Sequence, residues 1–600
     1  MSPARAIRIT IAAAFAAIAV RIVNVFWLHP LNWDEIEFFR ATDFVSRGLV
    51  PYRDFFEHHT PLQWFVFAPV AMLTHAVDGW AIVAMRIAQI PLWIATFVLM
   101  SIWMRDAGIS RFARWAAIAI AVSSSFLMLA AVEYRVDVLG CALYAGALVA
   151  MQRRHTFATG ALLALAGLAN LRLGPLLAIT AIAAVVLAPR AIARVSAGVA
   201  SVLALVGVYA LATRSLRVIF QDLWIDNLLG DRFADPVPLG FLHRLLLSFG
   251  VRIIAGNRNR FELATVDLGG IALILLGALG LVLALRVLHD PRFVLALLSI
   301  GNLLFIAKMK LIYNYHFEIV VVMMLPLIAT AIEWLARERF IVALVAVCAI
   351  TSSAAAFFRG KDADRSYQDF IMREVHRRTK PDDRVLDGVG WALRRDSAYR
   401  YWFLTALVRE LEPRKYIEPY DAPQAMNDPP AAFITDLNAL IYLRDHPRLR
   451  TFLQSHYLPR WFELWMPAPN ARLTPEHAQA EWIVPADGAY RVYASPRLAQ
   501  HPWFTDGRQA EVTLPRAPLV EGATLQWFVN GVARDASNGV LALRKKERLR
   551  VVATTSQPLG LFLIPGDDVR LFRQAPPGVS LDSLALRTTH VPSFAPFDPR

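Results

Sequence analysis

The chain has 600 residues, of which 56% are hydrophobic and 18% are charged, and its formal net charge is +14. A mean hydropathy of +0.43 is too apolar for an ordinary soluble protein of this length, so several membrane spans are expected. The positive charge does not indicate a nucleic-acid partner, because arginines in short loops between spans set membrane orientation. We therefore expect a lipid bilayer around the chain and no bound nucleic acid.

The apolar runs predict about eleven membrane helices, several of them shorter than the roughly 20 residues of a perpendicular span. The expected spans are 7–28, 80–104, 115–132, 136–151, 157–171, 174–188, 194–213, 265–287, 293–308, 315–335 and 340–357. The run that starts after Arg5 and Arg8 continues to about Leu28, which favours an uncleaved first span over a signal peptide. Residues 61–77 contain two prolines and polar side chains, so we expect an interfacial helix there.

Loop charges predict how the spans are oriented. With the N-terminus in the cytoplasm, every cytoplasmic loop is basic, as the positive-inside rule requires. The arginines of these loops are Arg105, Arg111, Arg114, Arg153, Arg154, Arg190, Arg194, Arg286, Arg292, Arg337 and Arg339. The opposite side then receives the acidic loop 30–60, the turn 133–137, the long loop 214–264 and the whole region after residue 358.

Composition divides the chain into three expected parts. Residues 1–358 form a multi-span membrane domain, residues 359–469 a small α/β region and residues 470–600 a β-rich domain that is typical of a sandwich. Strands are expected at 383–388 and 431–435, with helical sequence from 437 to 457. Further strands are expected at 489–493, 524–529, 548–552 and 559–564. The two cysteines, Cys141 and Cys348, lie in apolar runs and indicate no disulfide framework.

Acids, bases and aromatic residues gather on the predicted non-cytoplasmic side. The first loop contributes Asp34, Glu35, Glu37, Asp54, Glu57, His58 and His59, and later turns contribute Glu133, Arg135, Asp137, Arg172, Lys308, Lys310, Tyr313, Tyr315 and His316. Charges at a bilayer face are costly, so this concentration indicates a functional site. The mixture suits sugar transfer from a polyprenyl phosphate, which needs a carboxylate base near the anomeric carbon and cations for the departing phosphate.

Individual roles follow from this chemistry. Asp34 is the expected general base, and Asp137 is the second catalytic residue. The donor phosphate is assigned to Arg172, Lys310, His59 and Tyr313, and further substrate contacts to Glu35, Glu57, His58 and Arg135. A divalent metal such as zinc on Asp34, Asp137 and His58 is an additional hypothesis, because carboxylate and imidazole are its ligands. The pattern implies no other cofactor.

Each of these groups also has a purely structural interpretation. Asp34 and Glu35 can cap a helix, where carboxylates are favourable. The remaining alternatives are a solvated histidine pair at His58 and His59, a local ion pair among Glu133, Arg135 and Asp137, lysines that snorkel to headgroups at Lys308 and Lys310, and an aromatic belt at Tyr313 and Tyr315. The long-loop aspartates Asp222, Asp226, Asp231 and Asp235 are expected to be solvated.

Several motifs over residues 1–340 resemble those of GT-C fold membrane glycosyltransferases. They are the acidic pair in Trp33-Asp34-Glu35, the loop from Pro51-Tyr52 to Phe56-Glu57-His58-His59-Thr60-Pro61-Leu62, the Arg135-Val136-Asp137 turn, and Lys310 with its tyrosine segment. The chain is most similar to the bacterial branch with protein O-mannosyltransferase-like enzymes and lipid A aminoarabinose transferases (families 39 and 83).

The resemblance implies a polytopic α-helical fold in the bacterial inner membrane with a periplasmic active site. It also implies a polyprenyl-phosphate-linked sugar donor and transfer with inversion. By position, Asp34 matches the catalytic acid of the family and Asp137 its second acidic residue. The chain departs from the family in having His-His-Thr-Pro where a double proline is common, and in Asn314 and His316 near the late tyrosines.

The acceptor is expected in the cell envelope, as lipid A, another glycan, a lipid or a protein. A transporter or flippase for a lipid-linked or anionic substrate is the main alternative, and a membrane scaffold is a third. Transporters often have paired halves with polar groups at mid-membrane. Here the polar groups lie at span ends on one side, which favours the enzyme.

Overall fold

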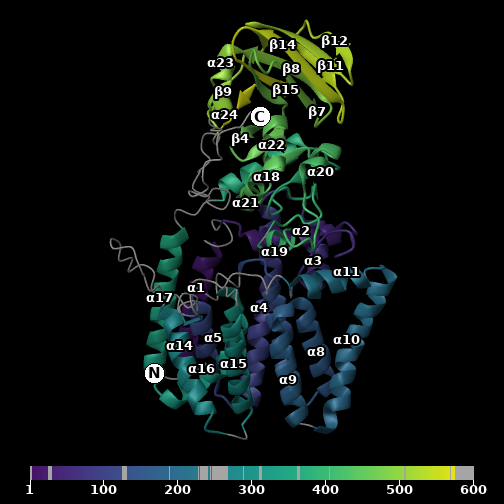
Figure 1. Ribbon diagram of the computed structural model, residues 1–600. Helices are drawn as coiled ribbons and strands as arrows, with labels where there is room; N and C mark the ends of the chain where they lie inside the picture. The colour runs from purple at the N-terminus through teal and green to yellow at the C-terminus, as the bar shows by residue number, and fades with distance from the viewer. Residues whose placement is uncertain are drawn as a thin grey trace. The chain divides into compact units, whose positions relative to one another are not determined.

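The computed structural model describes residues 3–23, 30–124, 132–187, 189–227, 229, 241–242, 245, 268–287, 290–309, 314–360, 365–404, 406–505, 509–567 and 569–573. The chain forms two compact units (Figure 1). Unit 1 comprises Met1–Ala76 and Trp80–Asp364, and unit 2 comprises Val77–Gly79 and Arg365–Arg600. The expected boundary between an α/β region and a β-rich domain, at residues 469 and 470 of the second unit, remains a prediction.

Unit 1 is helical. Its elements are α1 (Pro3–Val23), α2 (Trp33–Ser46), α3 (Leu62–Leu73), α4 (Trp80–Asp106), α5 (Arg111–Ser123), α7 (Val136–Gln152), α8 (Thr156–Ala169), η2 (Leu171–Leu173), α9 (Gly174–Leu187), η3 (Pro189–Ala191), α10 (Ile192–Ala212), α11 (Leu216–Phe220), the π-helix η4 (Gln221–Asp226), α14 (Leu268–Ala284), α15 (Pro291–Lys308), η6 (Asn314–Phe317), α16 (Glu318–Leu335) and α17 (Glu338–Gly360). Each expected span therefore contains a helix.

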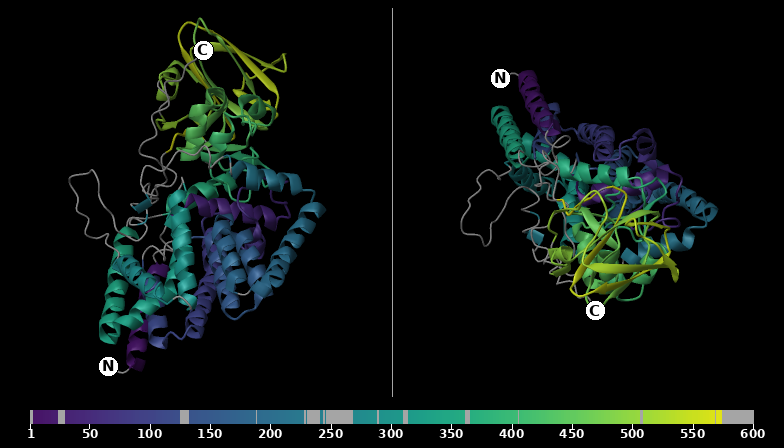
Figure 2. Two further views of the ribbon diagram at one scale, coloured as in Figure 1. Left: turned by 60° about the horizontal axis from the view of Figure 1, so that its bottom comes forward. Right: turned by 90° about the horizontal axis from the view of Figure 1, so that it is seen from above.

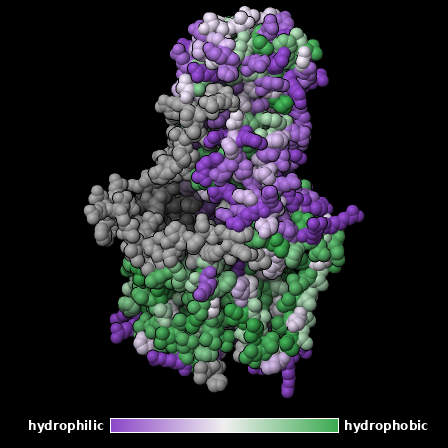
Figure 3. All heavy atoms as spheres, viewed as in Figure 1, coloured by the Kyte–Doolittle hydropathy of each residue, from purple (hydrophilic) through white to green (hydrophobic). Residues whose placement is uncertain are grey.

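Four helical segments among the described residues are long and apolar enough to cross a bilayer. They are Trp80–Asp106, Pro189–Ala212, Pro291–Lys308 and Tyr315–Leu335. Large apolar side chains of α9 and α10 face outward, including Ile182, Val186, Leu205 and Leu211, and Figure 3 shows hydrophobic residues gathered over these helices. Such a surface matches lipid, so the chain is a membrane protein with an α-helical spanning region. The full count of eleven spans remains a prediction.

Two short helices, α2 and α3, lie between α1 and α4 in the chain. At 14 residues, α2 is about 21 Å long, which is less than the roughly 30 Å of a hydrocarbon core. It is nevertheless buried on all sides from Glu35 to Phe44. Its start is a capping box, in which Asn32 accepts from the Asp34 backbone N–H and Glu35 accepts from the Asn32 N–H. Helix capping is thus confirmed for Glu35, whereas the Asp34 side chain pairs with Arg135 instead.

Unit 2 combines helices with β-sheets. Its helices are α18 (Ser366–Arg378), α19 (Ala406–Leu411), α20 (Ala422–Asn427), α21 (Leu437–Asp445), α22 (Pro447–His456), α23 (Pro496–Ala499) and α24 (Pro502–Thr505). A mixed sheet has the order β2-β1-β3-β5-β4, with β1 (Arg384–Leu386) parallel to β2 (Asp396–Ser397) and β3 (Ala432–Ile434), followed by β5 (Leu464–Pro467) and β4 (Tyr457–Trp461). The strands expected at 383–388 and 431–435 are confirmed.

After residue 470, two sheets share one apolar core. The first contains β10 (Leu519–Val520), β8 (Gly488–Ser495), β15 (Leu559–Pro565) and β6 (Asn470–Leu473), with β13 (Val540–Leu543) beside β8; the second contains β12 (Val532–Arg534), β11 (Ala523–Val529), β14 (Arg548–Thr555) and β7 (Gln479–Ile483). A small pair joins β16 (Arg570–Leu571) to β9 (Val512–Thr513). Trp482, Leu561 and Val551 belong to the common core, which is the expected sandwich.

Helices α8 and α10 lie side by side in unit 1 (Figure 2) and approach backbone to backbone. A Cβ atom on Gly160 would lie 2.0 Å from the carbonyl oxygen of Val195, and one on Gly198 would lie 2.2 Å from that of Phe157. Glycines permit this close approach because they have no side chain, and the resulting van der Waals contact holds the two helices together in lipid. A Cβ atom on Gly207, also in α10, would meet nothing within 4 Å.

We predict that Gly198→Leu destabilises unit 1 by roughly 1–3 kcal/mol, because the added side chain forces the two backbones apart. Thermal unfolding of the detergent-solubilised protein measures this loss. Gly207→Leu is the matched control, and we expect it to leave the melting temperature unchanged. Equal melting temperatures for both variants would contradict the close packing of α8 and α10.

Candidate functional site

Arg135 is the centre of a buried ionic network in unit 1. Its guanidinium donates to Asp34 at 2.9 Å, to Glu133 at 3.1 Å and to Asp137 at 3.4 Å. It also lies 3.7 Å from the ring centroid of Tyr315, a cation–π contact. The Arg135 side chain is only 2% exposed. The local ion pair expected at the turn is therefore present, and it extends to the first acidic loop.

Glutamines fix the backbone around Arg135. The Gln89 amide on α4 donates to the Glu133 carbonyl at 3.0 Å and accepts from the Arg135 N–H. Gln63 on α3 donates to the Arg135 carbonyl at 3.2 Å. A buried backbone group without a partner is costly, so these amides hold the turn in one conformation.

Asp34 and Glu35 are neighbours with different environments. Glu35 is 0% exposed and forms a bidentate pair with Arg86, at 2.6 and 2.5 Å, and it also accepts from the Tyr134 N–H. The Asp34 side chain, by contrast, keeps 30% of its surface exposed. The expected substrate contact of Glu35 has no support in this geometry, because its carboxylate is fully engaged in holding α2 against α4. Asp34 is the accessible acid of the pair.

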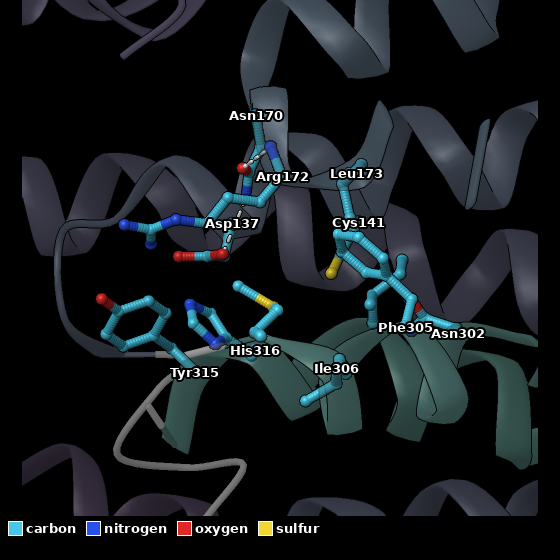
Figure 4. Close-up of a pocket in the computed structure, with 12 residues that line it drawn as sticks. Asp137, Cys141, Asn170, Arg172, Leu173, Asn302, Phe305, Ile306, Tyr315 and His316 are labelled. Atoms are coloured by element: carbon cyan, nitrogen blue, oxygen red, sulfur yellow. Dashed lines mark hydrogen bonds between the residues drawn. The ribbon is translucent and has the colours of Figure 1, made fainter. Parts of the chain in front are cut away.

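Asp137 and Arg172 line a small pocket beside this network. Asn170 joins them, since its amide donates to Asp137 at 2.7 Å and its oxygen accepts from the Arg172 backbone N–H. The pocket is lined by Asp137, Cys141, Asn170, Arg172, Leu173, Asn302, Phe305, Ile306, Met309, Tyr315, His316 and Ile319. Figure 4 shows Asp137, Tyr315 and His316 grouped toward one end, with apolar side chains toward the other.

That combination matches an amphipathic ligand. Arg172 lies 5.3 Å from the Tyr315 ring and offers a positive charge near Asp137. Phe305 and Ile306 come from α15, a helix long and apolar enough to span the membrane. An anionic headgroup suits the guanidinium, and an acyl or prenyl chain suits the apolar wall.

A second cluster lies on the loop that precedes α3. One ligand atom from each of Glu37, Glu57, His58 and His59 lies within 4.8 Å of the other three. Burial raises the pKa of Glu57 to about 7 and, together with the charges of Glu57 and Asp34, raises that of Glu37 well above its ordinary value. Burial also lowers the pKa of His59 to about 3 and that of His58 well below its usual range.

The metal hypothesis on Asp34, Asp137 and His58 does not fit this arrangement. The Arg135 guanidinium contacts both aspartates, so a positive group of the protein already lies where the hypothesis would place the metal ion. His58 instead faces Glu37 at 3.7 Å and Glu57 at 3.9 Å. The phosphate role of His59 remains a prediction, and its Nδ1 lies 2.9 Å from Glu57. Lys310 and Tyr313, which we assigned to the donor phosphate, lie outside the described residues.

The sequence analysis did not predict the burial of three acids. Asp222 and Asp226 on the π-helix η4 are 2% and 1% exposed, so the expectation that they are solvated is wrong. Asp231 and Asp235 lie outside the described residues. Glu318, at the start of α16, is 0% exposed, neither carboxylate oxygen has a hydrogen-bond partner among the described residues, and it interacts electrostatically with Asp137. An acid within an apolar span was the available signal for Glu318.

Comparison with known proteins places the fold. No protein-family model matches the chain, and no curated protein matches it. The structure is similar to that of ArnT from Cupriavidus metallidurans in the apo state, with 12% identity, a TM-score of 0.50 and coverage of 72% of this chain and 94% of that chain. ArnT bound to undecaprenyl phosphate matches at 13% identity with the same TM-score and coverage.

A further similar structure is the arabinofuranosyltransferase AftD from Mycobacteria, with 13% identity, a TM-score of 0.41 and coverage of 93% of this chain and 58% of that chain. ArnT is a GT-C fold glycosyltransferase. This chain therefore has the GT-C fold, which confirms the fold that the motifs of the first loop imply.

We predict that Arg135→Met destabilises the protein by roughly 3–5 kcal/mol, because Asp34, Glu133 and Asp137 lose their shared cation. Thermal unfolding in detergent measures the effect. Adding Asp137→Asn to Arg135→Met should recover part of the loss by removing one uncompensated charge. No recovery in the double variant would show that the loss does not arise from the carboxylates.

Proposed function

We propose that this protein is an inverting glycosyltransferase that moves a sugar from a polyprenyl-phosphate-linked donor to an acceptor of the bacterial envelope. The observation that carries the proposal is one accessible carboxylate, Asp34, linked through Arg135 to the amphipathic pocket of Asp137 and Arg172. ArnT, which shares the fold, binds undecaprenyl phosphate, and that supports a polyprenyl-linked donor here.

In the proposed reaction, Asp34 takes the proton of the acceptor hydroxyl as its oxygen attacks the anomeric carbon. The bond from that carbon to the phosphate oxygen breaks, and the electron pair leaves with the polyprenyl phosphate. Arg172 stabilises the negative charge on the departing phosphate. Asp137, held by Asn170 and Arg135, orients the acceptor and the arginine pair. Attack opposite the leaving group inverts the anomeric centre.

The proposal includes the wider setting of the site. The chain lies in the bacterial inner membrane with about eleven spans, and residues 359–600 lie in the periplasm. The basic loops of the cytoplasmic side support this orientation. Acceptors of the proposed enzyme are envelope molecules: lipid A, another glycan, a lipid or a protein.

We predict that Asp34→Asn lowers the rate of sugar transfer roughly 10²–10⁴-fold, because the amide cannot take the acceptor proton. Transfer is measured from a radiolabelled polyprenyl-phosphate sugar to membrane acceptors, with the purified enzyme in detergent. Asp54→Asn is the matched control from the same loop, since Asp54 is exposed and paired with Arg53. We expect Asp54→Asn to retain full transfer, and full transfer by Asp34→Asn would overturn the mechanism.

The variant Arg172→Gln tests the proposed role of Arg172 at the donor phosphate separately from the role of Asp34 as general base. We expect it to lower turnover roughly 10²–10³-fold through loss of leaving-group stabilisation. The loss should be smaller for a synthetic donor whose leaving group is a better one than the phosphate monoester of the natural donor. An equal loss for both donors would argue that Arg172 acts only on the structure.

A reporter fused after the C-terminal residue tests the proposed orientation. Alkaline phosphatase folds and is active only in the periplasm, so we expect an active fusion. Green fluorescent protein exported unfolded stays dark, and its fusion should be non-fluorescent. A fluorescent fusion with inactive phosphatase would put unit 2 in the cytoplasm and remove the proposed topology.

A further inference from the structure

We propose that Glu37, Glu57, His58 and His59 bind a divalent transition-metal ion of the zinc class. One ligand atom from each residue lies within 4.8 Å of the other three. Imidazole nitrogen and carboxylate oxygen are ligands that zinc takes in tetrahedral sites. None of the four belongs to the set that contacts Arg135. The inference does not rest on the proposed function, because metal binding is measured without a sugar donor.

The distances are close to those of a coordination shell. His59 Nδ1 lies 2.9 Å from Glu57 Oε1, and the Nδ1 atoms of His58 and His59 each lie 3.7 Å from Glu37 Oε1. His58 Nδ1 lies 3.9 Å from Glu57 Oε1. Ligand atoms at about 2.0 Å from a tetrahedral ion are separated by about 3.3 Å. These four separations lie within about 0.6 Å of that value. All four ligand atoms lie within 4.8 Å of one another, so the side chains would have to draw together around an ion.

The loop that carries three of the ligands is anchored from elsewhere in unit 1. The Tyr52 hydroxyl donates to the His59 carbonyl at 2.7 Å, and the Asn227 amide donates to the His58 carbonyl at 2.8 Å. Glu57 accepts from the backbone N–H groups of both histidines, at 2.9 and 3.0 Å. Outer contacts of this kind orient the ligands of a metal site and reduce the cost of assembling it.

The carboxylates of the cluster have little local compensation: Arg135 and Arg172 act electrostatically on Glu37 but form no ion pair with it within the described residues. Within the described part of the chain, the ion-pairing partners of Glu37 and Glu57 are only the two histidines. Glu57 is 1% exposed, and its Oε2 atom has no hydrogen-bond partner there. Buried carboxylates are costly unless they are paired or coordinate a metal.

Metal binding at this cluster would tie the loop to α2. Glu37 lies three residues after Asp34, so it is almost one helical turn further along the same helix. Glu57, His58 and His59 lie in the segment just before α3. An ion that joins them would set the position of the first turn of α2 against that loop. Its role would be to position Asp34, with no contact to the substrate.

The first test is the metal content of the full-length protein, purified in detergent with a tag that lacks histidine. Inductively coupled plasma mass spectrometry should find roughly one zinc-class ion per chain. The double variant His58→Asn/His59→Asn should lose it. The matched control is His75→Asn/His155→Asn, which removes two exposed histidines and should keep the ion. Wild-type protein without stoichiometric metal, before and after zinc addition, would overturn the proposal.

The second test does not depend on loss of a ligand. After chelation, cobalt(II) should give visible absorption bands of a four-coordinate site in wild-type protein. His58→Cys retains a ligand and should add a sulfur-to-cobalt charge-transfer band. Zinc should raise the melting temperature of the chelated wild type and leave that of the double histidine variant unchanged. An equal rise in both, or no new band in His58→Cys, would show that the ion binds elsewhere.

Discussion

One buried guanidinium organises the candidate site of this protein. Arg135 contacts Asp34 from α2, Glu133 from its own turn and Asp137 from α7, and it stacks on Tyr315 of η6. The rigid fork of arginine can satisfy several acceptors at once, whereas a lysine offers one compact charge. The guanidinium of Arg135 thus joins its own turn to Asp34, about a hundred residues earlier in the sequence. Asp34, Glu133 and Asp137 take their positions relative to this group.

The short helix α2 distributes three acids among three environments. Successive helical residues are rotated by about 100°, so Glu35 points away from Asp34 and Glu37, which are rotated from each other by only about 60°. Asp34 meets Arg135, Glu35 meets Arg86 on α4, and Glu37 meets the histidine loop. Because α2 is buried within the protein, these charges are stabilised by partners and kept from lipid. One helix therefore connects the proposed base, a structural ion pair and the proposed metal ligands.

Much of the fold was predictable because its signals are local. Long apolar runs predict helices wherever backbone groups must be satisfied inside lipid, and each expected span contains one. Alternating strands after residue 470 predict a sandwich, which the common core of β7, β8, β14 and β15 confirms. The expected helix from 437 to 457 is divided at His446 and Pro447, because proline removes an N–H and starts α22 afresh. A local sequence pattern predicts a helix, but it does not determine whether that helix crosses the whole bilayer.

By itself, the sequence determined the helical membrane class, the sheet-rich region and the acidic and histidine-rich loop, because hydropathy and residue type carry that information. Only the tertiary structure decided which acid stays accessible. Asp34 and Glu35 are adjacent and chemically alike, yet Arg86 from a distant helix engages one of them fully. It also decided that His58 and His59 join Glu37, and that Asp222 and Glu318 are buried. Burial and pairing depend on contacts between segments far apart in the chain, and periodicity along the sequence does not encode them.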